Sequence, residues 1–255
     1  MTETKQDAIR TYYHTLFSAW GRQHWWPAQS RFEMIIGAYL TQNTSWTNVE
    51  KALSNLRKAH LLTISGIRRT LRPKLEKLIR SAGYFRQKAQ RLKTFVRFLD
   101  EHYGGSLTRM FARPTVELRD KLLALNGIGP ETADSILLYA GNHPVFVVDA
   151  YTWRILERHK IVSSAAGYDE IRQLFEQALT GTPPPRQDLE ETPAAAGAPG
   201  PCHKPSRVST ADRTALVQVL NEMHGFIVGV GKTYCLKSQP RCEQCPLQKF
   251  LLEAK

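Results

Sequence analysis

Long apolar runs are missing from this 255-residue chain. A membrane-spanning helix needs roughly 18 or more consecutive apolar residues, and no stretch of the sequence approaches that length. The first ten residues, MTETKQDAIR, also lack the apolar core of a secretory signal peptide. These absences argue against a membrane protein. We expect a cytoplasmic protein, associated with the nucleoid if its source is a bacterium.

Acidic residues are few relative to basic ones. The chain has 23 Asp and Glu against 35 Lys and Arg, which gives a formal net charge of +12 and a sequence pI of about 9.7. This surplus favours a polyanionic partner, because lysine and arginine release counterions when they neutralise phosphates. The same charge is found in ordinary basic, soluble proteins. Nucleic acid is therefore the first partner to consider, pending more specific evidence.

Strand-like alternation is scarce as well. From about residue 5 to residue 180, apolar side chains recur at three-and-four spacing, as in Phe32, Ile35, Ile36, Tyr39 and Leu40. Glycines and prolines cut this pattern into about eight or nine segments, so we predict an all-α protein. The short apolar run 145–148 is interpreted as an extended connector that leads into the next helix.

One segment has a different composition. Residues 182–209 are rich in proline, alanine and glycine and poor in large apolar side chains. Such a stretch buries too little surface to offset the entropy lost on ordering, so it is predicted to be a flexible linker or insertion. The helical pattern resumes at Ala211 and runs to Phe226, before a cysteine-rich segment.

The segment 122–140, LLALNGIGPETADSILLYA, predicts a helix, a tight turn and a second helix. Gly127 and Gly129 permit positive φ and allow a ligand to approach the backbone closely. Pro130 suits the first turn of the second helix, whose free N–H groups and dipole favour a phosphate. Plain connections between helices also use glycine, so the pattern gains weight only from the residues downstream of it.

An aspartate lies about twenty residues after this hairpin. Asp149 stands in VFVVDAYTWRILERH, between an apolar run and the start of a helical segment. A carboxylate at such a position is most often only a helix cap. It can also activate water or stabilise positive charge on a sugar, if apolar walls enclose it near a bound phosphate. The residues alone leave both roles open.

Together these motifs resemble the helix-hairpin-helix DNA glycosylases of the endonuclease III superfamily, over about residues 20 to 250 apart from the linker. The matching segments are LNGIGPETAD, VVD with Arg154 downstream, HWWPAQSRFEMIIGAYLTQNTSWTNVEKAL, SAGYFRQKAQRL and HGFIVGVGKTYCLKSQPRCEQCPL. The resemblance implies a two-lobed helical fold. We expect residues 30–142 to form a helical barrel domain with the hairpin, and residues 1–29 with 143–255 to form the second lobe.

The resemblance also implies roles for individual residues. Asp149 is expected to be the catalytic aspartate, and Gly127 and Gly129 to donate N–H groups to a DNA phosphate. Gln42 matches the glutamine of the family loop that contacts the flipped-out nucleotide, although a plain surface amide is the alternative. The implied partner is duplex DNA that contains a lesion, bound by a monomer, and the implied process is base excision repair.

Glu131 departs from the family pattern in an informative way. Members that also cut the strand have a lysine at this point of the hairpin, and its amine attacks the sugar to form a Schiff base. A glutamate cannot form an imine. We therefore expect a monofunctional DNA glycosylase that hydrolyses the N-glycosidic bond of a damaged or mismatched base. The alternatives are a bifunctional glycosylase with AP lyase activity that uses another amine, and a non-catalytic helix-hairpin-helix DNA-binding protein.

Three tryptophans are candidates for the base pocket. Trp25 and Trp26, in His-Trp-Trp-Pro, and the segment around Glu131 resemble the 3-methyladenine glycosylase branch of the superfamily. Indole faces stack on electron-poor alkylated purines and gain a cation–π interaction of about 0.5 to 2 kcal/mol. With Trp46 and Glu131, these residues form the expected base pocket. A buried aromatic cluster that anchors the first helices is the alternative.

Only four cysteines occur, and three of them lie within eleven residues. In a reducing compartment such spacing favours metal ligation over disulfides. Cys235, Cys242 and Cys245 match the first three positions of the family's Cys-x6-Cys-x2-Cys-x5-Cys iron–sulfur signature. Leu251 stands where the fourth cysteine is expected, so the implied [4Fe–4S] cluster has an undefined fourth ligand.

Several alternatives remain open for this metal site. Cys202 could reach in from the linker, the cluster could be lost, or zinc could bind with a histidine such as His203 or His224. A structural metal at the hairpin is a further option. In each case the cysteine site is structural, and Lys232 is expected to contact DNA from the basic loop beside it.

Overall fold

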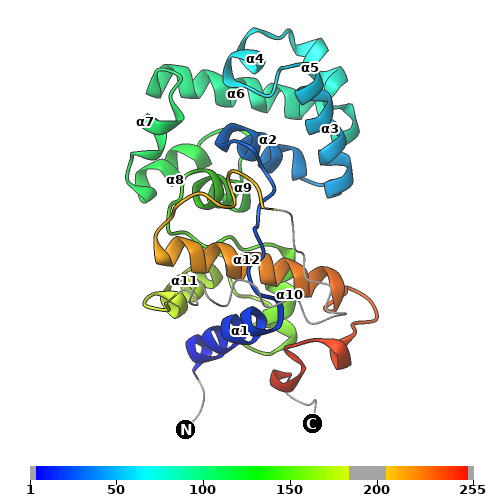
Figure 1. Cartoon of the computed structure of the whole chain (residues 1–255), viewed down its shortest axis with the longest axis vertical. Helices are drawn as coiled ribbons and strands as arrows, with labels where there is room; N and C mark the ends of the chain where they lie inside the picture. Colours follow the sequence, from blue (N-terminus) through cyan, green and yellow to red (C-terminus); the bar gives the residue numbers. More distant parts are fainter. Residues whose placement is uncertain (1–3, 184–204, 252–255) are drawn as a thin grey trace. The chain divides into compact units, whose positions relative to one another are not determined.

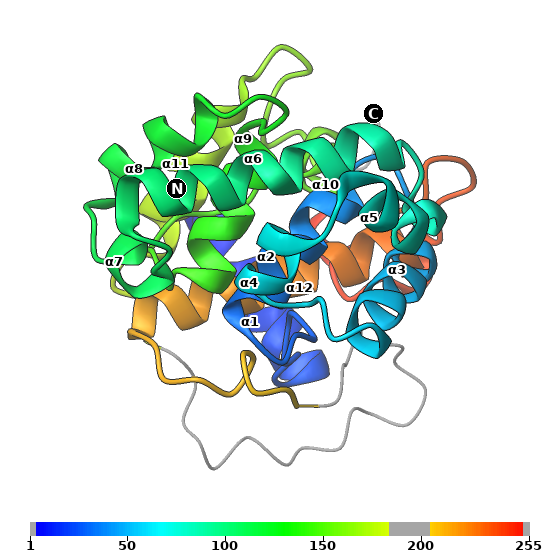
Figure 2. The same ribbon diagram turned by 90° about the horizontal axis from the view of Figure 1, so that it is seen from above.

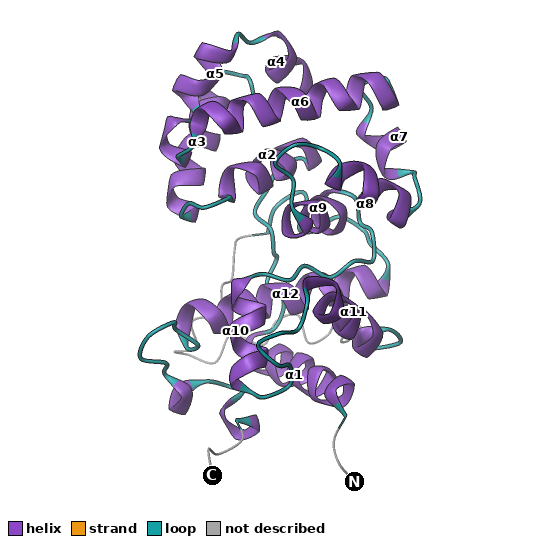
Figure 3. Ribbon diagram, turned by 180° about the vertical axis from the view of Figure 1, so that it is seen from behind, coloured by secondary structure: helices purple, strands orange, loops and turns teal. Residues whose placement is uncertain are grey.

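The computed structural model describes residues 4–183 and 205–251. Every regular element in these ranges is helical, and Figure 3, in which strands would be orange, shows only helices and loops there. The all-α prediction is confirmed, and the run 145–148 forms an extended connector without strand pairing. Within the same two ranges, none of the helices combines the length and the apolar character that crossing a bilayer requires.

The chain divides by its internal contacts into two compact units. We call Met1–Pro27 with Pro144–Lys255 the terminal unit and Ala28–His143 the central unit. Of the predicted linker 182–209, residues 184–204 lie outside the described residues. Its last part is held in the terminal unit, because the Ser206 hydroxyl donates to the Trp26 carbonyl over 3.3 Å and accepts the Ser209 N–H over 3.2 Å.

The terminal unit is organised around one central helix. Its described helices, shown in Figure 1, are α1 (Lys5–Trp20), α10 (Ala150–Arg158), α11 (Tyr168–Leu179) and α12 (Ala215–Thr233), followed by the 3₁₀ turns η4 (Cys242–Gln244) and η5 (Gln248–Phe250). Helix α12 packs against α1, α10 and α11, and nearly all of its residues are buried. A helix that is buried all round belongs in a core, so α12 is the support for this unit.

Helix α12 differs at both ends from the predicted 211–226 segment. It begins at Ala215, because Thr214 caps it by accepting the Val217 N–H over 3.4 Å. It continues past Phe226 to Thr233, since the apolar side chains beyond Phe226 are also buried. The helix therefore runs almost to the cysteine segment.

The central unit contains more and shorter helices than the pattern predicts. They are α2 (Arg31–Thr41), α3 (Trp46–Lys58), α4 (Ile64–Arg69), α5 (Arg72–Leu78), η1 (Arg80–Ala82), α6 (Phe85–Tyr103), α7 (Leu107–Phe111), α8 (Thr115–Leu123), α9 (Pro130–Ser135) and the π-helical η2 (Ile136–Ala140). Closely spaced turns leave α4, α5 and α7 only six, seven and five residues. The long α6, visible from above in Figure 2, packs against α2, α4, α5 and α7.

A buried lysine joins three of these elements. The Lys88 ammonium of α6 donates to the carbonyls of Leu40, Gln42 and Ala82 over 2.9, 2.7 and 2.8 Å. Burial lowers the pKa of Lys88 to about 8. Its three protons satisfy carbonyls at the ends of α2 and η1, which fixes the loop after α2 against α6.

Candidate functional site

Asp149 caps helix α10 in the terminal unit. Its Oδ1 accepts the Thr152 N–H over 2.8 Å and the Thr152 hydroxyl over 2.9 Å, and the Thr152 hydroxyl lies 3.3 Å from the Asp149 N–H. This reciprocal arrangement is a capping box. The Oδ1 oxygen of the carboxylate thus makes the cap contacts, and Oδ2 is the oxygen left for the expected catalytic role.

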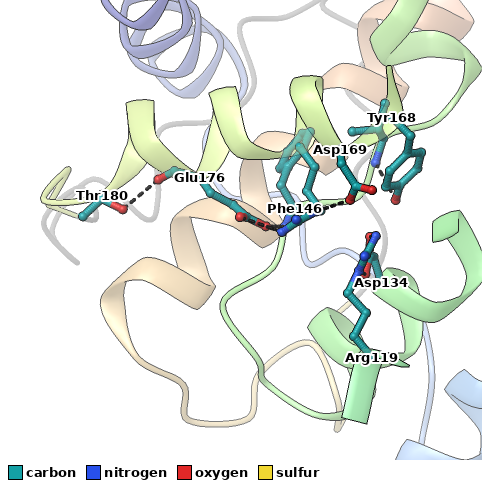
Figure 4. Close-up of polar contacts among 9 residues, drawn as sticks. Arg119, Asp134, Phe146, Tyr168, Asp169, Glu176 and Thr180 are labelled. Carbon is teal, nitrogen blue, oxygen red and sulfur yellow. Dashed lines mark hydrogen bonds and ion pairs between the residues drawn. The ribbon is translucent and has the colours of Figure 1, made fainter. Parts of the chain in front are cut away.

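The connector before Asp149 is held by helix α11, as Figure 4 shows. The Phe146 N–H donates to Glu176 Oε1 over 2.9 Å, and the Val148 N–H donates to the Tyr168 hydroxyl over 3.3 Å. The Phe146 ring stacks on Phe175 with centroids 4.0 Å apart. These contacts give the main-chain N–H groups of the connector the acceptors that a paired strand would otherwise provide. They therefore fix the position of Asp149 at the end of the connector.

The second oxygen of Asp149 faces a histidine from α12. Asp149 Oδ2 lies 3.7 Å from His224 Nε2, and the two side chains are 12% and 5% exposed. Burial alone would raise the pKa of Asp149, but the His224 imidazole and the two Thr152 donors outweigh it, so this pKa lies below its ordinary value. The carboxyl group is therefore held ionised in a largely enclosed place.

Trp25 and Lys232 border the same cluster. The Trp25 ring lies 6.3 Å from the His224 ring, edge to face, and Lys232 Nζ lies 5.8 Å from the centroid of the Trp25 ring. Burial lowers the pKa of Lys232, and the charge of Asp149 partly opposes this shift. The described structure thus brings together Asp149, His224, Trp25 and Lys232, and Lys232 belongs to the last turn of α12 rather than to the loop after it.

The other predicted pocket residues are distributed between both units. Trp26 belongs to the terminal unit, is buried, and contacts Trp25 edge to face at 6.1 Å. Trp46 begins α3 and Glu131 lies exposed in the first turn of α9, both in the central unit. Their roles in base recognition stay predictions.

The predicted hairpin is formed by α8, the turn 124–129 and α9. Its two helices are clamped by an ion pair in which Arg119 Nε lies 2.7 Å from the buried Asp134 carboxylate, as Figure 4 shows. Gly127 has a φ of +82°, whereas Gly129 has a φ of −93°, which any residue adopts. The expectation of positive φ is therefore correct for Gly127 and wrong for Gly129.

The turn leaves donor groups and space open. No hydrogen bond within the described ranges is donated by the main-chain N–H of Gly127 or Gly129. A Cβ on Gly129 would meet no atom within 4 Å. The space at this glycine is what the close approach of a ligand to the backbone requires.

Gln42 is bonded to this turn. Its Nε2 donates to the Gly127 carbonyl over 3.0 Å and to the Thr132 hydroxyl over 2.9 Å, and its Oε1 accepts from Arg91 Nη1 over 2.8 Å. The side chain is half-buried. Insertion of this amide at a flipped-out nucleotide, the role predicted from the resemblance, would require all three contacts to be released.

The cysteine segment packs against α10. Arg154 Nε donates to the Cys235 carbonyl over 2.6 Å, and Arg158 Nη1 lies 3.2 Å from Cys235 Sγ and donates to the Leu236 carbonyl over 2.6 Å. Since Asp149 caps the same helix, the segment supports the helix that holds the carboxylate. Its effect on the site is therefore structural.

The cysteines themselves provide an incomplete set of metal ligands. Cys235, Cys242 and Cys245 line one small cavity, but Leu251 also lines it, at the position expected for a fourth cysteine. Burial, and then the neighbouring thiols, raise the pKa of Cys245 to about 11. Within 4–183 and 205–251, no three His, Cys, Asp or Glu side chains are found arranged as a set of metal ligands, although the three cysteines line the same cavity.

The alternative metal ligands named from the sequence give no further support. Cys202 and His203 lie outside the described residues. His224, the other proposed zinc ligand, faces Asp149 instead. The residues present do not complete the donor set of a [4Fe–4S] centre, and the cluster stays a prediction from cysteine spacing.

Three residues of these sites were not identified from the sequence in their present roles. Thr152 could have been found, because Asp149-x-x-Thr152 is a capping-box spacing. His224 and Arg91 could not, since each meets its partner through the packing of helices that are distant in the chain.

Comparisons with known proteins identify the family to which this chain belongs. The family model of the HhH-GPD superfamily base excision DNA repair protein matches residues 36–180. The chain is 39% identical over 255 residues, 99% of each chain, to the candidate DNA repair glycosylase MJ1434 of Methanocaldococcus jannaschii. It is 27% identical to endonuclease III of Thermotoga maritima, over 85% of this chain and 80% of that protein.

Solved structures show the same relationship. The H. pylori 3-methyladenine DNA glycosylase MagIII, bound to 1,N6-ethenoadenine, matches with a TM-score of 0.68 and 27% identity over 90% of this chain and 97% of that one. A non-covalent endonuclease III–DNA complex matches in fold with a TM-score of 0.68, at 23% identity over 99% and 97% of the two chains. The chain therefore belongs to the HhH-GPD superfamily of base excision DNA repair proteins. It is a DNA glycosylase, an enzyme that acts on N-glycosyl bonds, and the resemblance inferred from its motifs is confirmed.

Proposed function

We propose that this chain is a monofunctional DNA glycosylase that removes a damaged base from duplex DNA by hydrolysis, with Asp149 as its catalytic residue. The observation that carries the proposal is the enclosed Asp149 carboxylate, whose pKa is held below its ordinary value. Glu131 supports the monofunctional form, because a carboxylate replaces the lysine that would form a Schiff base at that point of the hairpin. The protein is expected to act as a monomer.

The reaction depends on the charge of Asp149. Water forms a bond to C1′ while the bond from C1′ to the base nitrogen breaks and its electron pair leaves with the base. The carboxylate stabilises the positive charge that develops on the sugar and accepts a proton from the attacking water, which then passes to solvent. The products are the free base and an abasic site in an uncut strand.

An alkylated purine is the substrate class that this site favours. A cationic alkylated purine leaves as a neutral base when its glycosidic bond breaks, so its departure needs no acid to protonate it. Trp25 borders the Asp149 cluster but is itself buried, with Lys232 Nζ over its ring, so its indole would stack on such an electron-poor ring only after the side chains that cover it move aside. The likeness to a 3-methyladenine glycosylase bound to 1,N6-ethenoadenine supports the same class.

Release of free base from a panel of single-lesion duplexes tests the proposal. We expect release from a duplex with an N3-alkylated adenine, with the strand broken only after heat or alkali. Duplexes with an oxidised pyrimidine or a mismatched thymine should release little. Binding to every duplex without release of any base would contradict the proposal and favour a non-catalytic DNA-binding protein.

The iron–sulfur cluster is tested separately, since it has no step in this reaction. The prediction rests on the Cys-x6-Cys-x2-Cys spacing, and a cluster held by three cysteines leaves its fourth iron to another ligand. Iron and acid-labile sulfide in the purified protein, with a broad visible absorption band, would support it. Colourless, iron-free protein that releases base at the full rate would overturn it.

A further inference from the structure

Arg91 lies directly against the turn of the hairpin. It projects from α6, within the central unit, and its guanidinium occupies the space that a Cβ on Gly127 would need. Its Nη1 donates to Gln42 Oε1 over 2.8 Å. Gly127 is therefore required twice, once for its φ of +82° and once because the arginine packs on its α-carbon.

The direction of Arg91 is set by an amide that is itself fixed. The Gln42 side chain donates to the Gly127 carbonyl and the Thr132 hydroxyl, and the Gln42 main-chain carbonyl accepts from buried Lys88 over 2.7 Å. With both donor contacts made, the amide presents only its oxygen to Arg91. Gln42 therefore acts as a positioning residue that aims the guanidinium at the turn.

No carboxylate among residues 4–183 and 205–251 neutralises the charge of Arg91. Other arginines of the central unit form close ion pairs, such as Arg119 with Asp134 and Arg68 with Asp100. No carboxylate in the described ranges lies within ion-pair distance of Arg91. A guanidinium has five N–H donors, and a single hydrogen bond to Gln42 leaves the others available to a planar anionic group.

We propose that Arg91 is a phosphate-binding residue of the hairpin, which adds a charged donor to the main-chain N–H groups of Gly127 and Gly129. The ligand is one phosphate of the DNA backbone, contacted without reference to base sequence. The proposal rests on the proposed DNA-binding role of the hairpin, but it does not depend on base removal by Asp149.

The salt dependence of DNA binding tests this role. The affinity for a short, undamaged fluorescent duplex is measured at several salt concentrations for the wild type, Arg91→Met, Arg91→Lys and the control Arg97→Met. Methionine keeps an apolar stem against Gly127 without the charge. Arg97 lies on the same helix, exposed, 3.9 Å from Glu101. Unfolding midpoints of all four proteins show whether any change reflects folding.

We expect Arg91→Met to weaken binding about tenfold at low salt and to lower the slope of log affinity against log salt by about 0.9, the value for one phosphate contact. Arg91→Lys should keep most of the slope but bind more weakly than wild type, because an ammonium cannot reproduce the planar contacts. Arg97→Met should match the wild type. A folded Arg91→Met protein with the wild-type slope would overturn the proposal, whatever the outcome of the base-release assay.

Discussion

The terminal and central units differ in how far the polar groups of their candidate sites are enclosed by other side chains. Around Asp149, a carboxylate is enclosed by His224, Thr152 and the aromatic side chain of Trp25, where its charge is little screened by water. At the hairpin, the N–H groups of Gly127 and Gly129 donate no hydrogen bond to any described residue. Bond breaking benefits from a charge in a low-dielectric place, whereas holding a DNA phosphate requires donors that the backbone can reach.

The two units also use buried ionisable groups differently. In the central unit, Lys88 donates its three protons to carbonyls and serves only to fix a loop. In the terminal unit, Asp149 keeps one oxygen that makes no contact with the helix cap. We therefore expect substitutions in the terminal unit to change turnover, and substitutions at the hairpin to change affinity for DNA.

Asp149→Asn should have the largest effect on turnover. It removes the negative charge that stabilises the sugar and accepts the proton from water, so base release should slow by about 10²- to 10⁴-fold while affinity for undamaged DNA is kept. Asp7→Asn is a matched control, since Asp7 takes part in the capping box of α1 but is partly exposed. Single-turnover base release measures both, and equal rates for the two variants would refute the assignment.

Gly127→Ala should impair DNA binding and folding together. The alanine would have a disfavoured φ and its Cβ would displace Arg91, so we expect the hairpin to lose about 1 to 3 kcal/mol of stability and DNA affinity to fall at least tenfold. Gly129→Ala, which replaces the N-cap glycine of α9, should lower the unfolding midpoint only slightly and weaken DNA binding. Gly167→Ala, the same change at the N-cap of α11, should lower the midpoint as little and leave DNA binding unchanged. Wild-type affinity in both hairpin variants would show that DNA is held elsewhere.

His224→Asn should slow base release less than Asp149→Asn does, and its effect should depend on pH. The reaction needs ionised Asp149, whose pKa lies below the ordinary aspartate value of 3.8, so base release should persist to low pH as long as the fold does. Without the imidazole this pKa rises, and the acid limb of the rate profile should move to higher pH with about a tenfold lower plateau. His159→Asn, which alters a buried histidine bonded to Tyr12 over 2.7 Å, should leave the limb in place. An unmoved limb in His224→Asn would mean that the histidine only packs.

Glu222→Gln should change stability more than activity. Burial raises the pKa of Glu222 to about 7, although it accepts the Gln23 N–H over 2.9 Å. The folded state thus retains a proton that the unfolded chain has lost, and wild-type stability should fall as pH rises from about 4.5 to 7. Glutamine does not titrate, so the stability of the variant should not fall over this pH range, although its amide nitrogen cannot accept the hydrogen bond that Gln218 Nε2 donates to Glu222 Oε1 over 2.6 Å, which reduces the gain at pH 8. Urea unfolding at several pH values measures the difference, with the exposed Glu101→Gln as control. Parallel stability profiles for Glu222→Gln and wild type would contradict the shifted pKa.

The parts of the fold that depend on local signals could be predicted from the sequence. Helical periodicity and glycine or proline breaks identify an all-α chain, and the hairpin appears between α8 and α9 as its glycines predict. The apolar pattern places the start of α12 four residues early, because Thr214 sets it instead. Local capping competes with hydrophobic periodicity at helix ends, so boundaries are predicted less well than elements.

The surroundings of the site could be predicted only in part. Asp149 is marked by its position after an apolar run, and both of its expected roles, cap and candidate catalyst, remain compatible with its geometry. The approach of His224 depends on how α12 packs against α10, which no local pattern encodes. For the same reason, the contact between Gln42 and the hairpin could not be predicted from the sequence. Gln42 is expected at the flipped-out nucleotide, but its side chain is bonded to the turn.

Borohydride trapping on a duplex that contains the excised lesion tests the central claim most directly. Water attack at C1′ with Asp149 predicts released base, an uncut strand and no covalent protein–DNA adduct. An adduct would contradict the account, since only an amine that has replaced the base can be reduced onto the sugar. Peptide mapping would identify the residue that carries such an adduct, and Lys232, the lysine near Asp149, is the first candidate.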